Sequence, residues 1–198
     1  RAFDSIVHSK LLNKLYSCGI TGKLYKWISM CGHSSVANAI SGVPQGSVLG
    51  PILFILFIND IDSVCHGQTN IKLFADDAKL YSELDLNDRS VSLQISLDNI
   101  ATWADAWQLS INVQKCCVLS TVRNKRTSHT GSMNYYLNGI LLTNNEHVLD
   151  LGITISADLS YNAHINNIVA KALQRSSTLF RVLLHVIFNS CVKPLSHT

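Results

Sequence analysis

The sequence predicts an α/β fold in which a small antiparallel sheet packs against helices on one side. Three observations predict it. Hydrophobic residues make up 47% of the 198-residue chain and charged residues only 15%, a composition typical of a large core with little disorder. Several segments repeat apolar residues at helical spacing, and other, shorter segments have the residue pattern of strands. The length suits one domain, or one domain with a small appendage.

Helices are expected in four segments, which are residues 9–27, 48–61, 93–107 and 165–188. The first is expected to form two short helices joined by a turn, because Gly19 and Gly22 interrupt its leucines and aromatic residues. The second is apolar enough for a helix that is buried on most faces. The third is amphipathic, since Leu93, Leu97 and Ile100 recur on one face. Together these helices would supply the layer on which the sheet packs.

Strands are expected at residues 116–121, 135–142 and 149–155, and a short hairpin at residues 72–81. The hairpin carries Asp76 and Asp77 at its tip, between two apolar runs. Two adjacent carboxylates are costly to bury without a partner, and a bound metal ion is the usual partner. The alternative is an ordinary polar turn, since aspartate is a common turn residue.

The charge and the cysteine content restrict the class of protein. A net charge of +3 permits a nucleic-acid partner but does not require one. The six cysteines form no Cys-x-x-Cys pair, so neither a zinc site nor a disulfide scaffold is indicated, and we expect reduced core thiols in an intracellular protein. Nothing in the sequence distinguishes the nucleus from the cytoplasm or indicates an oligomeric state.

No apolar run reaches the ~20 residues that a membrane-spanning helix needs, and no signal peptide is visible.

A tight loop is expected at residues 41–47, Ser-Gly-Val-Pro-Gln-Gly-Ser, just before the apolar helix. Its small residues would let the backbone approach a nucleotide closely, and the Gln45 amide can both donate and accept a hydrogen bond. The loop is not a Walker-type phosphate loop, since no Gly-Lys-Ser/Thr follows. The alternative is a loop that only begins a helix and binds no ligand.

Two segments together resemble the palm of reverse transcriptases. The first is Ser-Gly-Val-Pro-Gln-Gly-Ser-Val-Leu-Gly-Pro at residues 41–51, and the second is Phe-Ala-Asp-Asp at residues 74–77. Their order and spacing are similar to those of non-LTR retrotransposons of the jockey-like LINE type. Three further segments resemble the family's pattern, namely Arg1–Asp4, Trp107–Cys116 and Asp150–Ile153. The resemblance therefore extends over nearly the whole chain.

The resemblance implies an RNA-directed DNA polymerase that adds deoxynucleotides to a DNA primer on an RNA template. Two Mg²⁺ ions would stabilise the attacking and leaving oxygens of the transferred phosphate, and Mg²⁺ prefers carboxylate oxygens as ligands. By the family pattern, Asp76 and Asp77 hold the metal. Lys115 would protonate the departing pyrophosphate, although an exposed lysine without a role is the alternative.

The resemblance also implies where the incoming nucleotide binds. Gln45 and Gly46 would contact it, and the Phe3 ring would lie under its sugar, exclude a 2′ hydroxyl and so select deoxynucleotides. RNA-templated RNA synthesis is an alternative that shares the two-metal chemistry, and Phe3 speaks against it. Basic residues in the last helical segment would follow the primer–template backbone, or would only form a solvated face. These basic residues are Lys171, Arg175 and Arg181.

For the domain organisation, the resemblance implies a palm over residues 1–143, truncated at its N-terminus. It implies a primer-grip region and the start of a helical thumb over residues 144–198. The family's leading metal-binding aspartate would lie upstream of Arg1, so Asp4 is not that residue. The segment between Trp27 and Ser41 is also shorter than the resemblance implies. We therefore expect the isolated chain to be inactive, and the alternative is a retrotransposon remnant that at most binds nucleic acid weakly.

Overall fold

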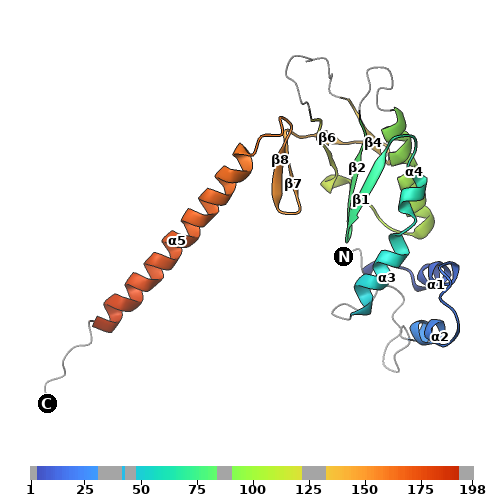
Figure 1. Cartoon of the computed structure of the whole chain (residues 1–198), viewed down its shortest axis with the longest axis horizontal. Coiled ribbons are helices and arrows are strands. Elements are labelled where there is room, and N and C mark those ends of the chain that lie inside the picture. The colour runs from blue at the N-terminus through green and yellow to red at the C-terminus, as the bar shows by residue number, and fades with distance from the viewer. Residues whose placement is uncertain (1–3, 31–41, 43–47, 84–90, 122–132, 192–198) are drawn as a thin grey trace. The chain divides into compact units, whose positions relative to one another are not determined.

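The structure is a computed structural model that describes residues 4–30, 42, 48–83, 91–121 and 133–191, with side chains as far as Val186 (Figure 1). It divides into two compact units. The first unit comprises residues 1–116 and 133–142, and the second comprises residues 117–132 and 143–198. The domain boundary expected after residue 143 stays a prediction.

The first unit begins with two short helices, α1 (His8–Ser17) and α2 (Gly22–Met30). The chain turns between them at Gly19 and Gly22. Their φ angles of 82° and 68° lie in the left-handed region, which glycine adopts without strain. The predicted pair of helices joined by a glycine-containing turn is therefore confirmed.

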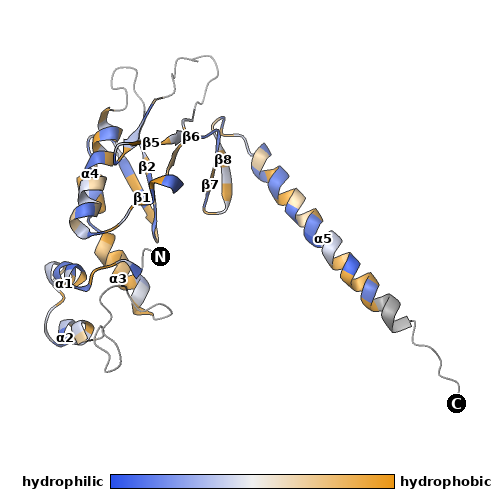
Figure 2. Ribbon diagram, turned by 180° about the vertical axis from the view of Figure 1, so that it is seen from behind, coloured by the Kyte–Doolittle hydropathy of each residue, from blue (hydrophilic) through white to orange (hydrophobic). Residues whose placement is uncertain are grey.

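The apolar segment forms α3 (Leu49–Ile58), which is followed by the short 3-10 helix η2 (Ile61–Val64). One side of α3 is buried, although Figure 2 shows that most of the helix is hydrophobic. The prediction that most faces of this helix are buried was wrong, because Ile52 and Ile55 are 49% and 56% exposed. An apolar side of α3 thus lies at the surface of the first unit.

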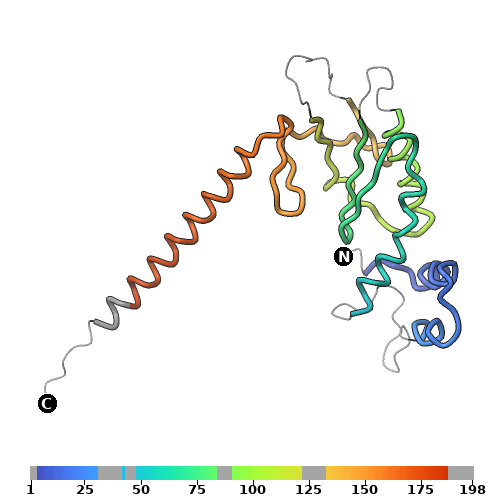
Figure 3. Tube along the Cα trace, in the orientation of Figure 1, coloured from blue at the N-terminus to red at the C-terminus, as the bar shows by residue number. Residues whose placement is uncertain are grey.

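The predicted hairpin follows η2 and consists of β1 (Asn70–Phe74) and β2 (Asp77–Tyr81), which pair antiparallel. Successive side chains of a strand point to opposite faces. Ile71 and Leu80 lie opposite each other and pack against the buried core, whereas the other face of the hairpin is exposed. Figure 3 follows the chain through the turn between the two strands. The hairpin and the place of the aspartates at its tip are confirmed.

The core of the first unit is built mainly by α1, α3 and α4 (Val91–Trp107). The helix α4 is amphipathic as predicted and buries Ser96, Ile100, Trp103 and Ala104. Burial of a large apolar side chain stabilises a fold by about 1.5–3 kcal/mol. The buried cluster consists of Ile6, Leu11, Leu15, Leu53, Phe54, Phe57, Ile58, Ile61, Ile100, Trp103 and Ala104. One face of the β1–β2 hairpin is therefore supported by helices from distant parts of the chain.

A second hairpin of the first unit, β4 (Tyr136–Leu137) and β5 (Ile140–Leu141), lies against α4. Gln94 of α4 fixes it with two hydrogen bonds. The side-chain amide of Gln94 donates to the Tyr136 carbonyl and accepts from the Tyr136 N–H, both over 2.9 Å.

The second unit contains a parallel pair, β3 (Cys117–Val118) with β6 (Thr143–Asn144), and a hairpin of β7 (His147–Asp150) and β8 (Ile153–Ser156). The strand expected at residues 116–121 is thus much shorter than predicted. Among the described residues the strands form four two-stranded sheets, three antiparallel and one parallel. The α/β fold class is confirmed, with its strands divided among small sheets.

Two segments that were expected to be single strands are hairpins. The β4–β5 segment turns at Asn138 and Gly139, with φ angles of 51° and 72°, and the β7–β8 segment turns at Leu151 and Gly152, with 48° and 86°. Two consecutive positive φ angles are characteristic of the type I′ turn, whose twist matches that of the paired strands. Both predictions were wrong because each turn glycine was taken as part of a strand.

The helix expected near the C-terminus is α5 (Asn162–Cys191), which contacts β8 in the second unit. The Thr154 N–H donates to Nδ1 of His164 over 3.1 Å, near the start of this helix. Every described side chain from Ile165 to Val186 is exposed, and Figure 2 shows hydrophilic and hydrophobic residues mixed along its length. Within the described residues, no helix is long and apolar enough to cross a membrane.

Candidate metal and nucleotide site

The turn between β1 and β2 presents two neighbouring carboxylates. Phe74 and Asp77 form the last strand pair, so Ala75 and Asp76 are the two residues of the turn. Ala75 has a φ of 51°, a left-handed conformation that is unfavourable for a residue with a Cβ. The paired strands on either side hold this strained residue in place beside Asp76.

Both carboxylates are exposed, and neither makes an ion pair or a side-chain hydrogen bond to another described residue. Mg²⁺ is usually held by one or two carboxylates together with phosphate oxygens of a substrate. Asp76 and Asp77 fit that donor set. In the described part of the chain, no group of three or more His, Cys, Asp and Glu side chains could hold a metal ion. The turn is therefore suited to a divalent ion that a phosphate group also binds.

Side chains of α4 fasten the segment that leads from α3 into β1. The Asn99 amide donates to the Val64 carbonyl over 2.9 Å. The Ser96 hydroxyl, which is fully buried, accepts the N–H of His66 over 2.8 Å. Hydrogen bonds to backbone groups fix the path of a segment as well as its position. The segment just before the hairpin is thus tied to α4.

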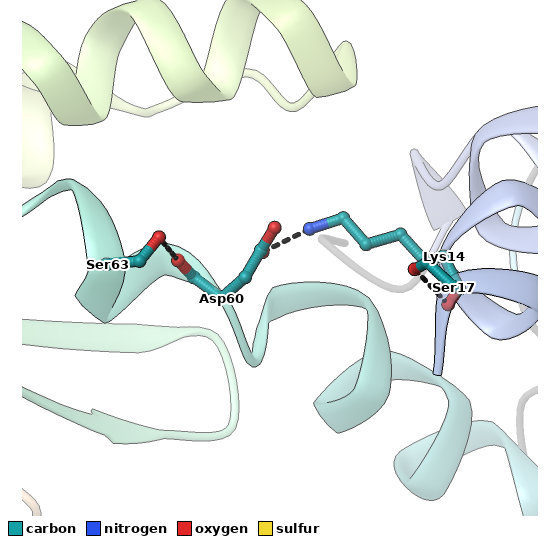
Figure 4. A network of polar contacts seen from close by, with 4 residues as sticks. All are labelled: Lys14, Ser17, Asp60 and Ser63. Atoms are coloured by element: carbon teal, nitrogen blue, oxygen red, sulfur yellow. Dashed lines mark hydrogen bonds and ion pairs between the residues drawn. The ribbon is translucent and has the colours of Figure 1, made fainter. Parts of the chain in front are cut away.

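Lys14 is the centre of a buried cluster that the sequence pattern did not reveal (Figure 4). Its ammonium group donates to the carboxylate of Asp60. The same group lies over the rings of Trp107, Trp103 and Phe57, at 3.9, 4.8 and 5.5 Å from their centroids. An aromatic face attracts a cation within about 6 Å of its centre. Burial lowers the pKa of Lys14 from its ordinary value, and the hydrogen bond and charge of Asp60 oppose this shift.

The Lys14 cluster joins α1 to the beginning of η2. The Ser63 hydroxyl donates to the Asp60 carbonyl over 2.6 Å, as Figure 4 shows, so this residue is held through both its backbone and its side chain. The available sequence signal was a lysine between Leu11 and Leu15 on the buried side of α1. A basic residue on an apolar helix face needs a partner of opposite charge, but the sequence does not identify which acidic residue is that partner.

Lys115 ends the short 3-10 helix η3 (Val113–Lys115) in the first unit, and its side chain is exposed. Its backbone N–H donates to the Asn112 carbonyl over 3.0 Å. Between the described residues, no contact joins its ammonium group to Asp76 or Asp77. Its role as a proton donor therefore stays a prediction.

Three predicted nucleotide-binding residues lie outside the described residues: Phe3, Gln45 and Gly46. Gly42, the second residue of the predicted loop, is described. Its N–H donates to the Ile6 carbonyl over 2.8 Å, and its own carbonyl accepts a hydrogen bond from Nε2 of His8 over 2.7 Å. The structure thus joins residues that lie shortly after Phe3 and shortly before Gln45 in the sequence.

The segment expected to form the primer grip, Asp150–Ile153, makes the turn of the β7–β8 hairpin in the second unit. Leu149, Leu151 and Ile153 are exposed around this turn. The basic residues of α5 are exposed as well. The roles of both features in holding a primer stay predictions.

The cysteines whose side chains the structure describes form no disulfide, and they are Cys18, Cys65, Cys116 and Cys117. Cys18 is exposed, so the expectation of a core thiol was wrong for this residue, whereas the other three are half-buried and Cys65 packs against the core. Burial raises the pKa of Cys65, and the charge of Asp62 adds to the shift. A raised thiol pKa lowers the fraction of reactive thiolate at neutral pH.

A helix-backed hairpin with two carboxylates at its turn is suited to metal-dependent chemistry on phosphate groups. Residues 1–157 match the family model described as reverse transcriptase (RNA-dependent DNA polymerase), and the chain belongs to this family. In general, the family acts on nucleic acid and nucleotides and uses divalent metal ions.

The chain is similar to polymerases of Drosophila mobile elements. It is 35% identical over 149 residues to the RNA-directed DNA polymerase from mobile element jockey of Drosophila melanogaster, covering 71% of this chain and 16% of the relative. It is 30% identical over 187 residues to the polymerase of the same name from Drosophila funebris, covering 85% and 20%. It is 26% identical over 223 aligned positions to the probable RNA-directed DNA polymerase from transposon BS of Drosophila melanogaster, covering 98% and 24%.

The chain thus spans about a fifth of the length of these curated relatives. The expected likeness to jockey-like elements is confirmed. No solved structure matches the chain.

Proposed function

We propose that this chain forms part of the palm of an RNA-directed DNA polymerase, which adds deoxynucleotides to a DNA primer on an RNA template. The observation that carries the proposal is the Asp76–Asp77 pair at the two-residue turn of the β1–β2 hairpin, in a chain of the reverse transcriptase family. The partners would be the RNA template, the DNA primer and deoxynucleoside triphosphates. The divalent ion would be Mg²⁺, which prefers oxygen ligands of this kind.

Asp76 and Asp77 would hold the metal ions, which supply Lewis-acid stabilisation of the attacking and leaving oxygens when bound. Other residues of the chain would orient the reactants. The Gln45 amide would hydrogen-bond to the sugar of the incoming nucleotide, and the Phe3 ring would exclude a 2′ hydroxyl from that position. Lys115 would donate a proton to the departing pyrophosphate.

The contacts around the hairpin support this proposal because catalytic groups must be held in place by the residues behind them. One face of the hairpin packs on the core through Ile71 and Leu80. The segment that leads into β1 is held by Lys14, Ser96 and Asn99. The two carboxylates therefore extend from a support that is fixed on several sides.

A chimeric polymerase tests the proposal. Residues 1–157 would replace the matching segment of the Drosophila melanogaster jockey polymerase, and primer extension would be measured on an RNA template with deoxynucleotides and Mg²⁺. We expect template-dependent extension that disappears in the Asp76→Asn chimera. The matched control is Asp62→Asn, another exposed aspartate of the first unit, which should leave extension unchanged.

Two results would contradict the proposal. The first is a folded, RNA-binding chimera that extends no primer beyond the background of its Asp76→Asn variant. The second is extension that proceeds equally well with ribonucleotides, which would contradict the assignment of deoxynucleotides as the substrate.

A further inference from the structure

The β1–β2 hairpin is anchored near its base and is exposed toward its tip. Ile71 and Leu80, which lie opposite each other one residue from the base, pack against the buried core. Every residue between them, from Lys72 through the turn to Lys79, is exposed. The five residues of β1 span about 17 Å at about 3.4 Å per residue. The direction of the hairpin at its base therefore determines where the carboxylates at its tip lie.

A tight turn at residues 66–69 leads directly into β1, and a side chain of α4 holds it. The Thr69 N–H donates to the His66 carbonyl over 3.2 Å, and the Thr69 side chain is buried. The hydroxyl of Ser96, which is fully buried, accepts the N–H of His66 over 2.8 Å. The same hydroxyl donates to the Ser92 carbonyl over 2.8 Å. Ser96 thus joins the first residue of the turn to the helix.

The second residue of this turn approaches α4 closely. Gly67 has a φ of 59°, and a Cβ at this position would lie 2.9 Å from Oγ of Ser92. A residue with a side chain would therefore have to move away from the helix. Ser92 and Ser96 are four residues apart and lie on the same face of α4. The turn is thus held at two points that are one helical turn apart, which restricts its direction as well as its position.

We propose that Ser96 and Gly67 are positioning residues, which set the direction in which the hairpin carries Asp76 and Asp77. A tilt of roughly 3° at the base moves a tip that is about 17 Å away by about 1 Å. A misplacement of about 1 Å by a distant substitution can lower a catalytic rate about 100-fold. The catalytic consequence rests on the proposed polymerase function, whereas the direction of the hairpin can be measured without it.

The matched variants Ser96→Thr and Ser96→Val test the proposal in the chimeric polymerase, because they have the same shape and only threonine keeps the hydroxyl. At a temperature where both are folded, kcat should be at least about tenfold lower in Ser96→Val, with KM for the primer–template within about twofold. Gly67→Ala, at an exposed site, should likewise lower kcat. The control Thr102→Val removes an exposed hydroxyl that donates to the Asp98 carbonyl, and it should leave kcat unchanged.

The direction of the hairpin can be measured in the full chain by pulsed electron paramagnetic resonance. Spin labels would be carried by unnatural amino acids at the exposed positions of Ala78, near the tip, and Asp105 on α4. The distance between the labels should shift or broaden by roughly 1 Å or more in Ser96→Val and in Gly67→Ala, relative to Ser96→Thr.

Identical distance distributions in Ser96→Thr, Ser96→Val and Gly67→Ala would overturn the proposal. Equal kcat values of Ser96→Thr and Ser96→Val in an active chimera would overturn it as well, and so would a change confined to KM. If the distances change as expected but the chimera extends no primer, the polymerase function fails and the role of Ser96 and Gly67 in directing the hairpin stands.

Discussion

Lys14 in α1 donates a hydrogen bond from its buried ammonium group to the carboxylate of Asp60, 46 residues further along the chain. The Lys14 side chain is 5% exposed, whereas that of Asp60 is 47% exposed. The loss of Asp60 should therefore destabilise the fold more than the loss of the Lys14 charge. A carboxylate at the surface can be hydrated when its partner is lost, but a buried ammonium group cannot.

This inequality predicts opposite tolerances to substitution. Asp60→Ala should lower the free energy of unfolding by about 1–3 kcal/mol, because a buried cation loses its charged hydrogen-bond partner. Lys14→Met should stay within about 1.5 kcal/mol of the wild type, because methionine replaces the apolar stem in similar volume. Urea denaturation measures both values. Asp62→Ala, at an exposed neighbouring aspartate, is the control, and a greater loss in Lys14→Met than in Asp60→Ala would contradict the prediction.

The lowered pKa of Lys14 predicts how its contribution changes with pH. Between that lowered pKa and the ordinary value of 10.5, the unfolded chain binds a proton that the folded chain lacks. The free energy of unfolding should therefore rise with pH through this window, relative to the Lys14→Met variant. Denaturation curves of the two proteins at a series of alkaline pH values check the sign. A difference that falls with rising pH would mean that the ion pair with Asp60 dominates over burial.

The turn beside Asp76 should become more stable when its strain is removed. A left-handed conformation costs a residue with a Cβ roughly 1–2 kcal/mol, while a glycine costs about 0.4–1 kcal/mol through the freedom of the unfolded chain. Ala75→Gly should therefore raise the free energy of unfolding by up to about 1.6 kcal/mol. The control is Ala78→Gly in β2, which should lower it by about 0.5–1 kcal/mol. Losses of equal size in both variants would show that Ala75 is not strained.

Metal binding to the turn can be measured without catalysis. Mn²⁺, which takes oxygen ligands like Mg²⁺, can be titrated with the full chain and followed by electron paramagnetic resonance. Asp76→Asn should weaken the binding at least about tenfold, or about 1.4 kcal/mol, because one of two carboxylates is lost. Asp62→Asn should leave it unchanged. Identical Mn²⁺ affinities of these two variants would remove Asp76 from the metal site.

The elements with strong local patterns could be predicted from the sequence. The helical spacing of Leu93, Leu97 and Ile100 is sufficient to predict the helix α4. The apolar runs on either side of Asp76 and Asp77 are sufficient to predict the β1–β2 hairpin. The type I′ turn at Asn138 and Gly139 was equally local, since Asn-Gly is a strong hairpin signal, and it was missed because a longer strand was assumed.

The supporting contacts could not be predicted in the same way. The partner of Lys14 is fixed by how α1 meets the end of α3, and helical periodicity specifies only which face of a helix is buried. The same holds for Ser96 and Asn99. The sequence shows them only as polar residues of a helix, and it does not show that the segment from η2 to β1 lies beside them. Their partners are backbone groups, which nearly every residue has, so the types of the neighbouring residues do not indicate these hydrogen bonds.

Each of the three hairpins closes between residues that are near neighbours in the chain, through a turn of two residues. Isolated hairpins form within roughly 1–10 μs, because little loop entropy is lost on closure. The β3–β6 pair and the hydrogen bond from Lys14 to Asp60 join distant residues and require the closure of much longer loops. The Asp76–Asp77 turn is therefore closed by local contacts alone, whereas the contacts that hold it against the helices require the closure of long loops.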